Sequence, residues 1–345
     1  MARLRNAYFN CQTEDGRPVP WEPPALPEGV KPDGVFFGEV LARLDGRLSQ
    51  GGLTFYITQD VATLPRYGKD VVVILIGDEF TRVPEYAGRV LAIFKNLAIR
   101  PALTSNVMRD PSWVNLWTLP WYLRTWAYHL PGLAAYRRRR RVGGWVAPIW
   151  RLPVGTSNQV PLPVKPVGER AHDLFFAGSI AHEHGAGGSE RINPKVLSRR
   201  EMATQVKRLA ARHPELSVEL IDTGAFAESM EADALAYSER LMDSRVALVP
   251  RGTAIDTLRF WQALRFGCVA VVDAVPHHPR FYDGAPVLRV RGWHELERVV
   301  VPLLSDGAAL DRLHERSLEW WRTRGSEDAL AAYIAERLNR LRRDH

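Results

Sequence analysis

One stretch of the sequence, residues 244–273, has the pattern of a strand, a polar loop, a helix and a second strand. Its two ends are apolar runs rich in β-branched side chains, which are typical of buried strands in a parallel sheet. Between them, residues 258–266 have helical spacing, and Asp256 or Thr257 would cap this helix, because a side-chain oxygen can accept from its first N–H groups. Such a unit predicts an α/β fold with parallel strands.

The loop of this unit is a candidate ligand site. It would lie at the carboxyl edge of the sheet, where doubly wound folds bind ligands, and a helix N-terminus there attracts anions. Arg251 and Arg259 flank the loop. Two interpretations stay open at this point, a diphosphate site or two solvated charges at an ordinary βαβ corner.

The composition sets limits on the class of protein. The 345 residues are 46% hydrophobic and 25% charged, which predicts a soluble chain long enough for two domains. Cys11 and Cys268 form no disulfide framework or zinc motif, and no signal peptide or membrane span is evident, so a cytoplasmic protein is expected. The net charge of +7 indicates anionic partners, such as nucleotides, anionic lipids or nucleic acid.

The first half of the chain has the pattern of a Rossmann-like domain. Residues 1–34 are rich in proline and charge and are expected to be extended on the surface. Strands are expected at residues 53–58, 70–76 and 89–95. Asp78 and Glu79 follow the second of these strands, which places two carboxylates at the carboxyl edge of the predicted sheet.

An aromatic and basic insertion is expected at residues 106–150. It holds six of the 11 tryptophans, and residues 137–141 are five consecutive arginines. Three interpretations stay open: contact with a membrane interface, an ordinary helical insertion with an aromatic core face, and contact with nucleic acid. The candidate contacts to an acceptor or a membrane are Trp121, Trp126, Arg137, Arg138 and Arg139.

The sequence of the second half of the chain predicts a second α/β domain. Residues 150–170 read as a linker, and residues 173–177 as a strand that leads into Gly178 and Ser179. Helices are expected at residues 199–212, 235–242, 293–304, 310–322 and 329–343. The predicted domains are residues 1–155 and 156–325, with a C-terminal helix in residues 326–345 that could pack back on the N-terminal domain.

The unit at residues 244–273 resembles the C-terminal signature of exostosin-like (GT47-type) glycosyltransferases. The matching positions are Pro250, Gly252, Thr257, Arg259, Gln262, Ala263, Leu264, Gly267 and Cys268. The similarity extends over roughly residues 170–280. It implies a GT-B fold, in which two Rossmann-like domains face each other across a cleft, the C-terminal one for a nucleotide-sugar and the N-terminal one for an acceptor.

The resemblance also implies the chemistry. Transfer would invert the anomeric carbon without an obligatory metal or other cofactor, and the sequence has no Asp-x-Asp motif. An inverting transfer needs a base to deprotonate the acceptor hydroxyl, for which Asp78 and Glu79 are the candidates. The co-substrate would be a nucleotide-sugar, with a UDP-sugar expected.

The resemblance assigns the donor site to residues of the second domain. Arg251 and Arg259 would hold the diphosphate, with Thr257 and the loop backbone as further donors. The full candidate set is Gly178, Ser179, Arg191, Arg251, Gly252, Thr253, Asp256, Thr257, Arg259 and Gln262. Gln262 stands where the family has a glutamate, so it would bond the donor ribose without charge assistance.

The expected function is hexosyl or pentosyl transfer to a glycan or glycolipid, as in polysaccharide biosynthesis, in the cytoplasm or at the inner face of the membrane. Two alternatives stay open: transfer to hydroxylated DNA bases, and non-catalytic binding of a nucleotide or phosphoglycan.

Overall fold

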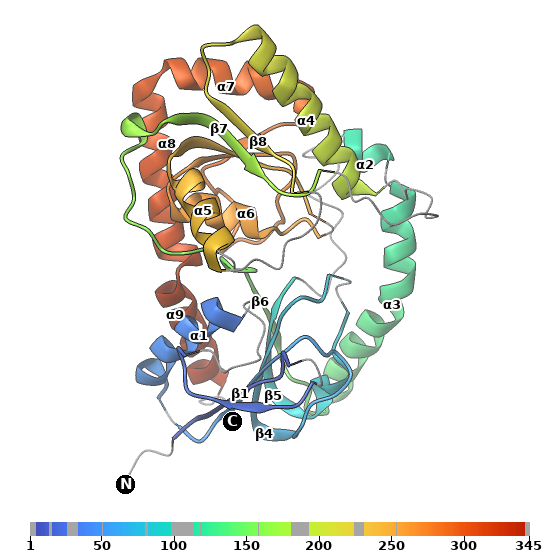
Figure 1. The fold of residues 1–345 in the computed structure, drawn as a ribbon. Helices are drawn as coiled ribbons and strands as arrows, with labels where there is room; N and C mark the ends of the chain where they lie inside the picture. The colour runs from blue at the N-terminus through green and yellow to red at the C-terminus, as the bar shows by residue number, and fades with distance from the viewer. Residues whose placement is uncertain are drawn as a thin grey trace. The chain divides into compact units, whose positions relative to one another are not determined.

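The computed structural model describes residues 5–13, 16–25, 34–49, 51–79, 82–97, 113–117, 119–157, 159–180, 193–223, 231–252 and 254–341. The chain divides into two compact units. Unit 1 comprises Met1–Pro101, Arg124–Ser157 and Gly325–His345, and unit 2 comprises Ala102–Leu123 and Asn158–Arg324. Each unit contains its own sheet (Figure 1).

The sheet of unit 1 is mostly parallel. Its strands are β1 (Ala7–Asn10), β2 (Val19–Trp21), β3 (Thr54–Thr58), β4 (Gly68–Leu75), β5 (Val90–Asn96) and β6 (Ile149–Leu152). Their order is β2-β1-β3-β4-β5-β6, and β2 alone runs antiparallel to its neighbour in this sheet. β3 and β5 are buried along their whole length, as expected for strands covered on both faces.

Helices from distant parts of the sequence complete unit 1. They are α1 (Gly34–Leu44), most of α3 (Leu119–Val142) and α9 (Glu327–Leu341), with short 3₁₀ turns at Asp45–Arg47 and Glu85–Gly88. α9 packs on α1, and its Tyr333 ring contacts Phe94 of β5 edge-on. The last helix of the sequence therefore belongs to the same core as the first.

Unit 2 has a fully parallel sheet in which the order of strand addition reverses once. Its strands are β7 (His172–Ala177), β8 (Val218–Ile221), β9 (Ser244–Val249), β10 (Val269–Val272) and β11 (Leu288–Arg289), in the order β11-β10-β9-β7-β8. The chain first adds β8 on one side of β7, then returns to add β9 on the other. The switch point lies between β7 and β9, and α/β sheets bind ligands at such points.

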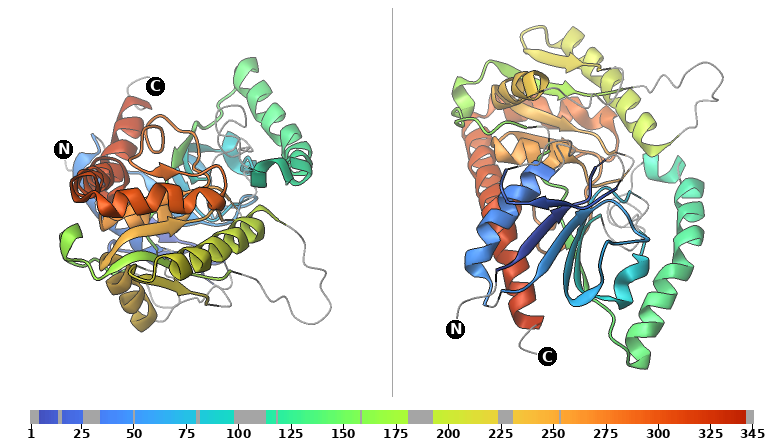
Figure 2. Two further views of the ribbon diagram at one scale, coloured as in Figure 1. Left: turned by 90° about the horizontal axis from the view of Figure 1, so that it is seen from above. Right: turned by 60° about the horizontal axis from the view of Figure 1, so that its bottom comes forward.

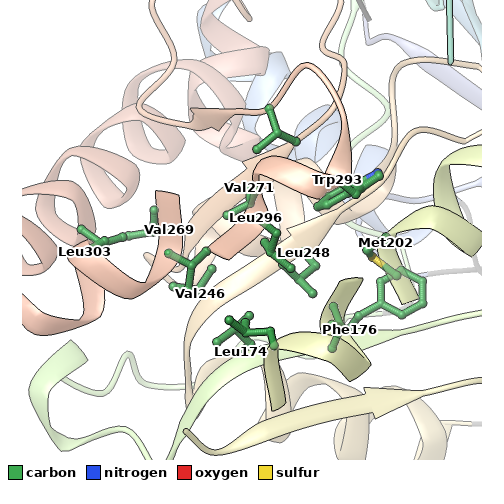
Figure 3. Packing of buried hydrophobic residues seen from close by; sticks show 14 of the residues in the cluster. Leu174, Phe176, Met202, Val246, Leu248, Val269, Val271, Trp293, Leu296 and Leu303 are labelled. Atoms are coloured by element: carbon green, nitrogen blue, oxygen red, sulfur yellow. The ribbon is translucent and has the colours of Figure 1, made fainter. Parts of the chain in front are cut away.

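The helices of unit 2 are α2 (Trp113–Trp117), α4 (Pro194–Arg212), α5 (Glu231–Met242), α6 (Leu258–Arg265), α7 (Leu296–Ser305) and α8 (Gly307–Trp320), with a π-helical turn at Trp321–Gly325 and 3₁₀ turns at Val167–Glu169 and Trp293–Glu295. Alternate residues of the central strands meet α4 and α7 in one apolar cluster (Figure 3). Phe176, Leu248 and Val271 are each at most 2% exposed there, and burial of a side chain of this size contributes roughly 1.5–3 kcal/mol.

The predicted α/β class is confirmed, with two Rossmann-like units. The unit at residues 244–273 forms β9, α6 and β10, and Thr257 is the N-cap residue of α6. Two expectations were wrong. Residues 1–34 contain β1 and β2, which extend the sheet of unit 1, and the first part of the expected linker at residues 150–170 lies in β6. These strands are only three or four residues long, so they carry little alternation to recognise.

Among the described residues, no helix combines the length and apolar character needed to cross a bilayer.

A buried arginine joins three parts of unit 2. Arg170 is 2% exposed, and its guanidinium donates to the carbonyl oxygens of Lys165 (3.1 Å), Ser244 (2.7 Å) and Phe266 (2.5 Å). These carbonyls belong to the loop before β7, the start of β9 and the end of α6. One side chain thus donates hydrogen bonds to backbone carbonyls that would otherwise have few donors.

We expect Arg170→Met to lower the free energy of unfolding by about 3 kcal/mol or more, because it leaves buried carbonyls without donors. Urea denaturation followed by circular dichroism measures the change. Lys165→Met is the control, since it removes only a half-buried ion pair with Asp243 and should cost less than about 1 kcal/mol. Equal losses in the two variants would contradict this account of Arg170.

Candidate anion-binding site

The switch point of unit 2 brings two strand ends together. β7 ends at Ala177, which is followed by Gly178 and Ser179, and β9 ends at Val249, which leads through the loop to α6. Arg259 is the second residue of α6. The candidate site is therefore built from the ends of β7 and β9 and the first turn of α6.

Arg259 lies against the end of β7. Its Nε and Nη2 donate to the carbonyl oxygen of Ala177 at 3.0 and 2.7 Å, and its guanidinium lies 5.1 Å from the centre of the Phe176 ring. No carboxylate in the described part of the chain forms an ion pair with it. Burial lowers the pKa of Arg259, so its charge is held in place without a neutralising partner.

Gly178 makes this approach possible. Its φ is +152°, and a Cβ built there would lie 1.9 Å from Nη2 of Arg259. Any side chain at this position would therefore displace the guanidinium or the strand end. The glycine predicted to line the donor site is the residue that admits the arginine.

Arg199 supplies a second cation at the same strand end. It lies on α4, is 5% exposed, and donates through Nη1 to the carbonyl oxygen of Ser179 at 2.6 Å. Its Nε is buried without a hydrogen-bond partner. Burial, and then the charge of Arg259, lower the pKa of Arg199 to about 9, despite the attraction of Asp273 and Asp222. Two cations that repel each other thus converge on the end of β7.

The first turn of α6 adds unused donors. Thr257 is its N-cap residue, but its side chain makes no capping bond, and its Oγ1 is buried without a partner. The first N–H groups of any helix lack intrahelical acceptors and carry a partial positive charge. The hydroxyl and the helix terminus belong to the same end of α6 as Arg259.

Arg251 is paired with a carboxylate of the protein itself. Its side chain is fully buried, with Nε 2.6 Å from Oδ2 of Asp273, and its backbone N–H donates to Oδ1 of the same carboxylate at 2.9 Å. Burial alone would lower the pKa of Arg251, but Asp273 and Tyr122 outweigh it and raise the pKa. The charge of Arg251 is therefore already compensated within the protein. Its predicted contact with a diphosphate stays a prediction.

The carboxylate of Asp273 also connects to α4. Its Oδ2 accepts from the hydroxyl of Ser198 at 2.8 Å, and Nε1 of Trp293 donates to that hydroxyl at 2.9 Å. Ser198 directly precedes Arg199 in the sequence. The same network therefore fixes the loop after β9 and the turn of α4 that carries the second cation.

The remaining predicted donor-site residues are partly described. Gln262 is 4% exposed, and its Oε1 accepts from the hydroxyl of Tyr237 at 2.8 Å. Asp256 is buried and accepts from the hydroxyl of Tyr282. Gly252 precedes the α6 turn, and a Cβ built on it would lie 3.3 Å from Cγ2 of Thr257. Arg191 and Thr253 lie outside the described residues. The ribose contact predicted for Gln262 stays a prediction.

The two candidate bases follow β4 in unit 1 and differ in environment. Asp78 has a fully buried side chain, 2.9 Å from Lys95 and 2.9 Å from Arg82. Burial would raise the pKa of Asp78, but these two cations outweigh it and lower the pKa. Lys95 is 1% exposed, and burial lowers its pKa to about 8. Glu79 is exposed. A buried, doubly paired carboxylate is a poor proton acceptor. The role of either carboxylate as the base stays a prediction.

The aromatic and basic candidates lie on α3. Trp121 and Trp126 are half-buried, whereas Arg137, Arg138 and Arg139 are exposed. In the part of the chain that the structure describes, no group of three or more His, Cys, Asp or Glu side chains could hold a metal ion.

Comparisons with known proteins find only distant similarity. No protein-family model matches the sequence, and no curated protein matches it. One similar solved structure is a chain of the GtfA/B complex, with 14% identity, 81% of this chain and 58% of that chain covered, and a TM-score of 0.43. This chain thus spans a little over half the length of that protein. The exostosin-like subtype stays a prediction.

Two other solved structures are similar over most of their length. Sucrose-phosphate synthase from Thermosynechococcus elongatus has 11% identity, with 93% of this chain and 81% of that chain covered and a TM-score of 0.39. The glycosyltransferase SnogD from Streptomyces nogalater has 12% identity, with 91% and 82% covered and a TM-score of 0.37. Similarities this distant leave the function to be argued from the site itself.

Arg199 is the site residue that the sequence pattern missed. It falls in a helix with several basic residues, among them Arg200, Lys207 and Arg208, which are all exposed. Helical spacing does carry a signal, because Arg199 lies on the same face of α4 as the buried Met202, Val206 and Leu209. The basic composition of the helix obscures this signal.

We expect Gly178→Ala to weaken binding of inorganic diphosphate by about tenfold or more, because the methyl group displaces Arg259 and a charge-assisted bond is worth about 1.5–3 kcal/mol. Isothermal titration calorimetry measures the change. Gly168→Ala is the control, since no atom lies within 4 Å of a Cβ at that position. Unchanged diphosphate affinity in Gly178→Ala would refute the role given to Arg259.

We expect Asp78→Asn to lower the free energy of unfolding by about 3 kcal/mol at pH 7, because it leaves the buried Lys95 without its anion. The pKa of Asp78 is lowered in the folded state, so its contribution is present above the unfolded value of about 3.9 and is lost as the pH falls through the folded pKa. Urea denaturation at several pH values measures both effects.

The matched control is Asp70→Asn, which removes an exposed ion pair with Arg66 and should cost less than about 1 kcal/mol. A loss in Asp78→Asn no larger than in this control would show that the buried pair with Lys95 has little effect on stability.

Proposed function

We propose that this chain is a GT-B glycosyltransferase that moves a sugar from a nucleotide-sugar donor to a hydroxyl acceptor, with unit 2 as the donor-binding unit. The observation that supports it is the convergence of Arg199 and Arg259 on the end of β7, at the switch point. Arg199 is buried and Arg259 is half-buried, and no carboxylate of the described residues forms an ion pair with either. The two charges therefore raise the free energy of the empty protein, and an anion with two or more negative charges would lower it.

The leaving group of such a transfer is a nucleoside diphosphate. The acceptor oxygen attacks the anomeric carbon, the bond from that carbon to the diphosphate oxygen breaks, and the base takes the hydroxyl proton. Negative charge grows on the diphosphate in the transition state. Arg199, Arg259 and the α6 N-terminus are preorganised donors for that charge, so they would stabilise the transition state more than the bound donor.

The finer points of the proposal rest on the sequence pattern. The transfer is inverting and metal-independent, with a UDP-sugar as donor and a glycan or glycolipid as acceptor. Glu79 is the proposed base, because Asp78 is already paired with Lys95 and Arg82. Gln262 would bond the ribose through its amide nitrogen, since its Oε1 accepts from Tyr237.

A binding experiment tests the proposal. We expect UDP, GDP or dTDP, or a sugar linked to one of them, to raise the melting temperature by mass action. CMP should bind more weakly, because it has a single phosphate. Arg199→Gln and Arg259→Gln should each weaken the preferred diphosphate by about 10- to 100-fold, the value of one charge-assisted contact of about 1.5–3 kcal/mol. Arg208→Gln, an exposed neighbour on α4, is the control and should change nothing.

Three outcomes would contradict the proposal. If no nucleoside diphosphate raises the melting temperature, or if Arg208→Gln weakens binding as much as Arg199→Gln, the anion site is not a donor site. If a nucleotide binds but no nucleotide-sugar is consumed with glycan, glycolipid or hydroxylated DNA acceptors, the chain is a non-catalytic binder.

A further inference from the structure

Exposed apolar side chains are concentrated in one part of the sequence. Of ten exposed large hydrophobic side chains in the described part of the chain, seven fall within residues 113–142. They are Trp113 (61%), Leu116 (50%), Trp117 (78%), Leu123 (51%), Tyr128 (78%), Leu130 (48%) and Val142 (78%). Single exposed apolar residues need no explanation, but contiguous ones mark an interaction surface. Tyr128, Leu130 and Val142 lie on the part of α3 that belongs to unit 1.

Helix α3 has a buried side and an uncharged exposed side. His129, Leu133 and Tyr136 recur at helical spacing and are buried, and the hydroxyl of Tyr136 donates to the carbonyl oxygen of Ala147 at 3.0 Å. The exposed residues between them are Ala127, Tyr128, Leu130, Pro131, Gly132, Ala134 and Ala135. Residues 125–136 contain no Asp, Glu, Lys or Arg. This side of the helix thus offers only apolar and aromatic groups to its surroundings.

The arginine run continues this exposed side toward the C-terminal end of α3. Residues 137–141 are all exposed arginines, and no described carboxylate forms an ion pair with any of them. Residues 113–142 contain six arginines and no Asp or Glu. Figure 2 shows α3 as one long helix, so the apolar part and the basic part follow each other along a single element.

We propose that the exposed side of α3 is a docking surface for an anionic lipid bilayer. The arginines would meet acidic headgroups, while Tyr128, Leu130 and their neighbours enter the interface, where an amphipathic helix buries its apolar side chains to a depth of about 5–10 Å. Nucleic acid would use the arginines but would leave Leu130 and Pro131 in water. This inference is independent of the proposed function, since a bilayer could recruit the chain whatever unit 2 binds.

Vesicle flotation at about 0.1 M salt tests the proposal with the full chain. We expect the protein to float with vesicles of phosphatidylcholine containing phosphatidylglycerol, and to stay in solution with vesicles of phosphatidylcholine alone. High salt should reduce the bound fraction, because headgroup attraction is screened.

Two variants separate the contributions. Replacing Arg137, Arg138 and Arg141 with Gln should reduce partitioning on the order of 100-fold, since each basic residue near the surface contributes about fivefold. Replacing Tyr128 and Leu130 with Ser should reduce it by at least tenfold, through the loss of apolar burial. The matched control replaces Arg200, Lys207 and Arg208 of α4 with Gln, which removes the same charge from another exposed helix and should have little effect.

Three outcomes would overturn the proposal. The first is no binding to either kind of vesicle. The second is an equal loss in the control and the α3 arginine variant, which would indicate attraction by net charge alone. The third is tight binding of a short DNA duplex that depends on Arg137, Arg138 and Arg141 but not on Tyr128 and Leu130, with vesicles failing to compete.

Discussion

The buried ion pair between Arg251 and Asp273 is the interaction on which the candidate site depends. It ties the second residue after β9 to the residue after β10, and through Ser198 it also reaches α4. A buried pair must overcome a large desolvation cost, which it does only with good geometry and with its remaining lone pairs satisfied. Here each oxygen of Asp273 has a hydrogen-bond donor other than the guanidinium. Oδ1 accepts from a backbone N–H, and Oδ2 accepts from a hydroxyl. Arg251, near the start of the loop that leads into α6, is therefore held in place before any ligand arrives.

This use of Asp273 decides the electrostatics of the switch point. Its carboxylate is committed to Arg251, so among the described residues the hydrogen-bond acceptors of Arg199 and Arg259 are backbone carbonyls. Their lowered pKa values show the cost of that arrangement. Packing of α4 and α6 on the sheet holds the two charges together, as is common where stability is given up for binding. Apolar contacts away from the two arginines thus hold these charged side chains in position.

The sequence predicted the parts of this structure that are local. The strand, loop and helix at residues 244–273 were predictable because each boundary carries its own signal, such as the apolar run before Pro250 and the glycine at position 267. The sequence did not predict which arginine pairs with a carboxylate of the protein and which does not. Arg251 and Arg259 flank the loop in the same way, and only the fold brings Asp273 to one of them and Arg199 to the other. Likewise Asp78 and Glu79 are neighbours in sequence, but Lys95, from the next strand, pairs with Asp78 alone.

The return of α9 to unit 1 has a consequence for the order of folding. The apolar face of α1, with Phe37, Val40 and Leu44 at most 1% exposed, is covered by a helix that the ribosome makes last among the described elements. Domains fold as units during synthesis, and uncovered apolar surface is prone to aggregation. Unit 2 is nearly complete in the chain before α9 emerges, whereas α1 must wait for it. The apolar face of α1 therefore stays without its native cover until α9 has been made, and exposed apolar surface of this kind is what chaperones bind.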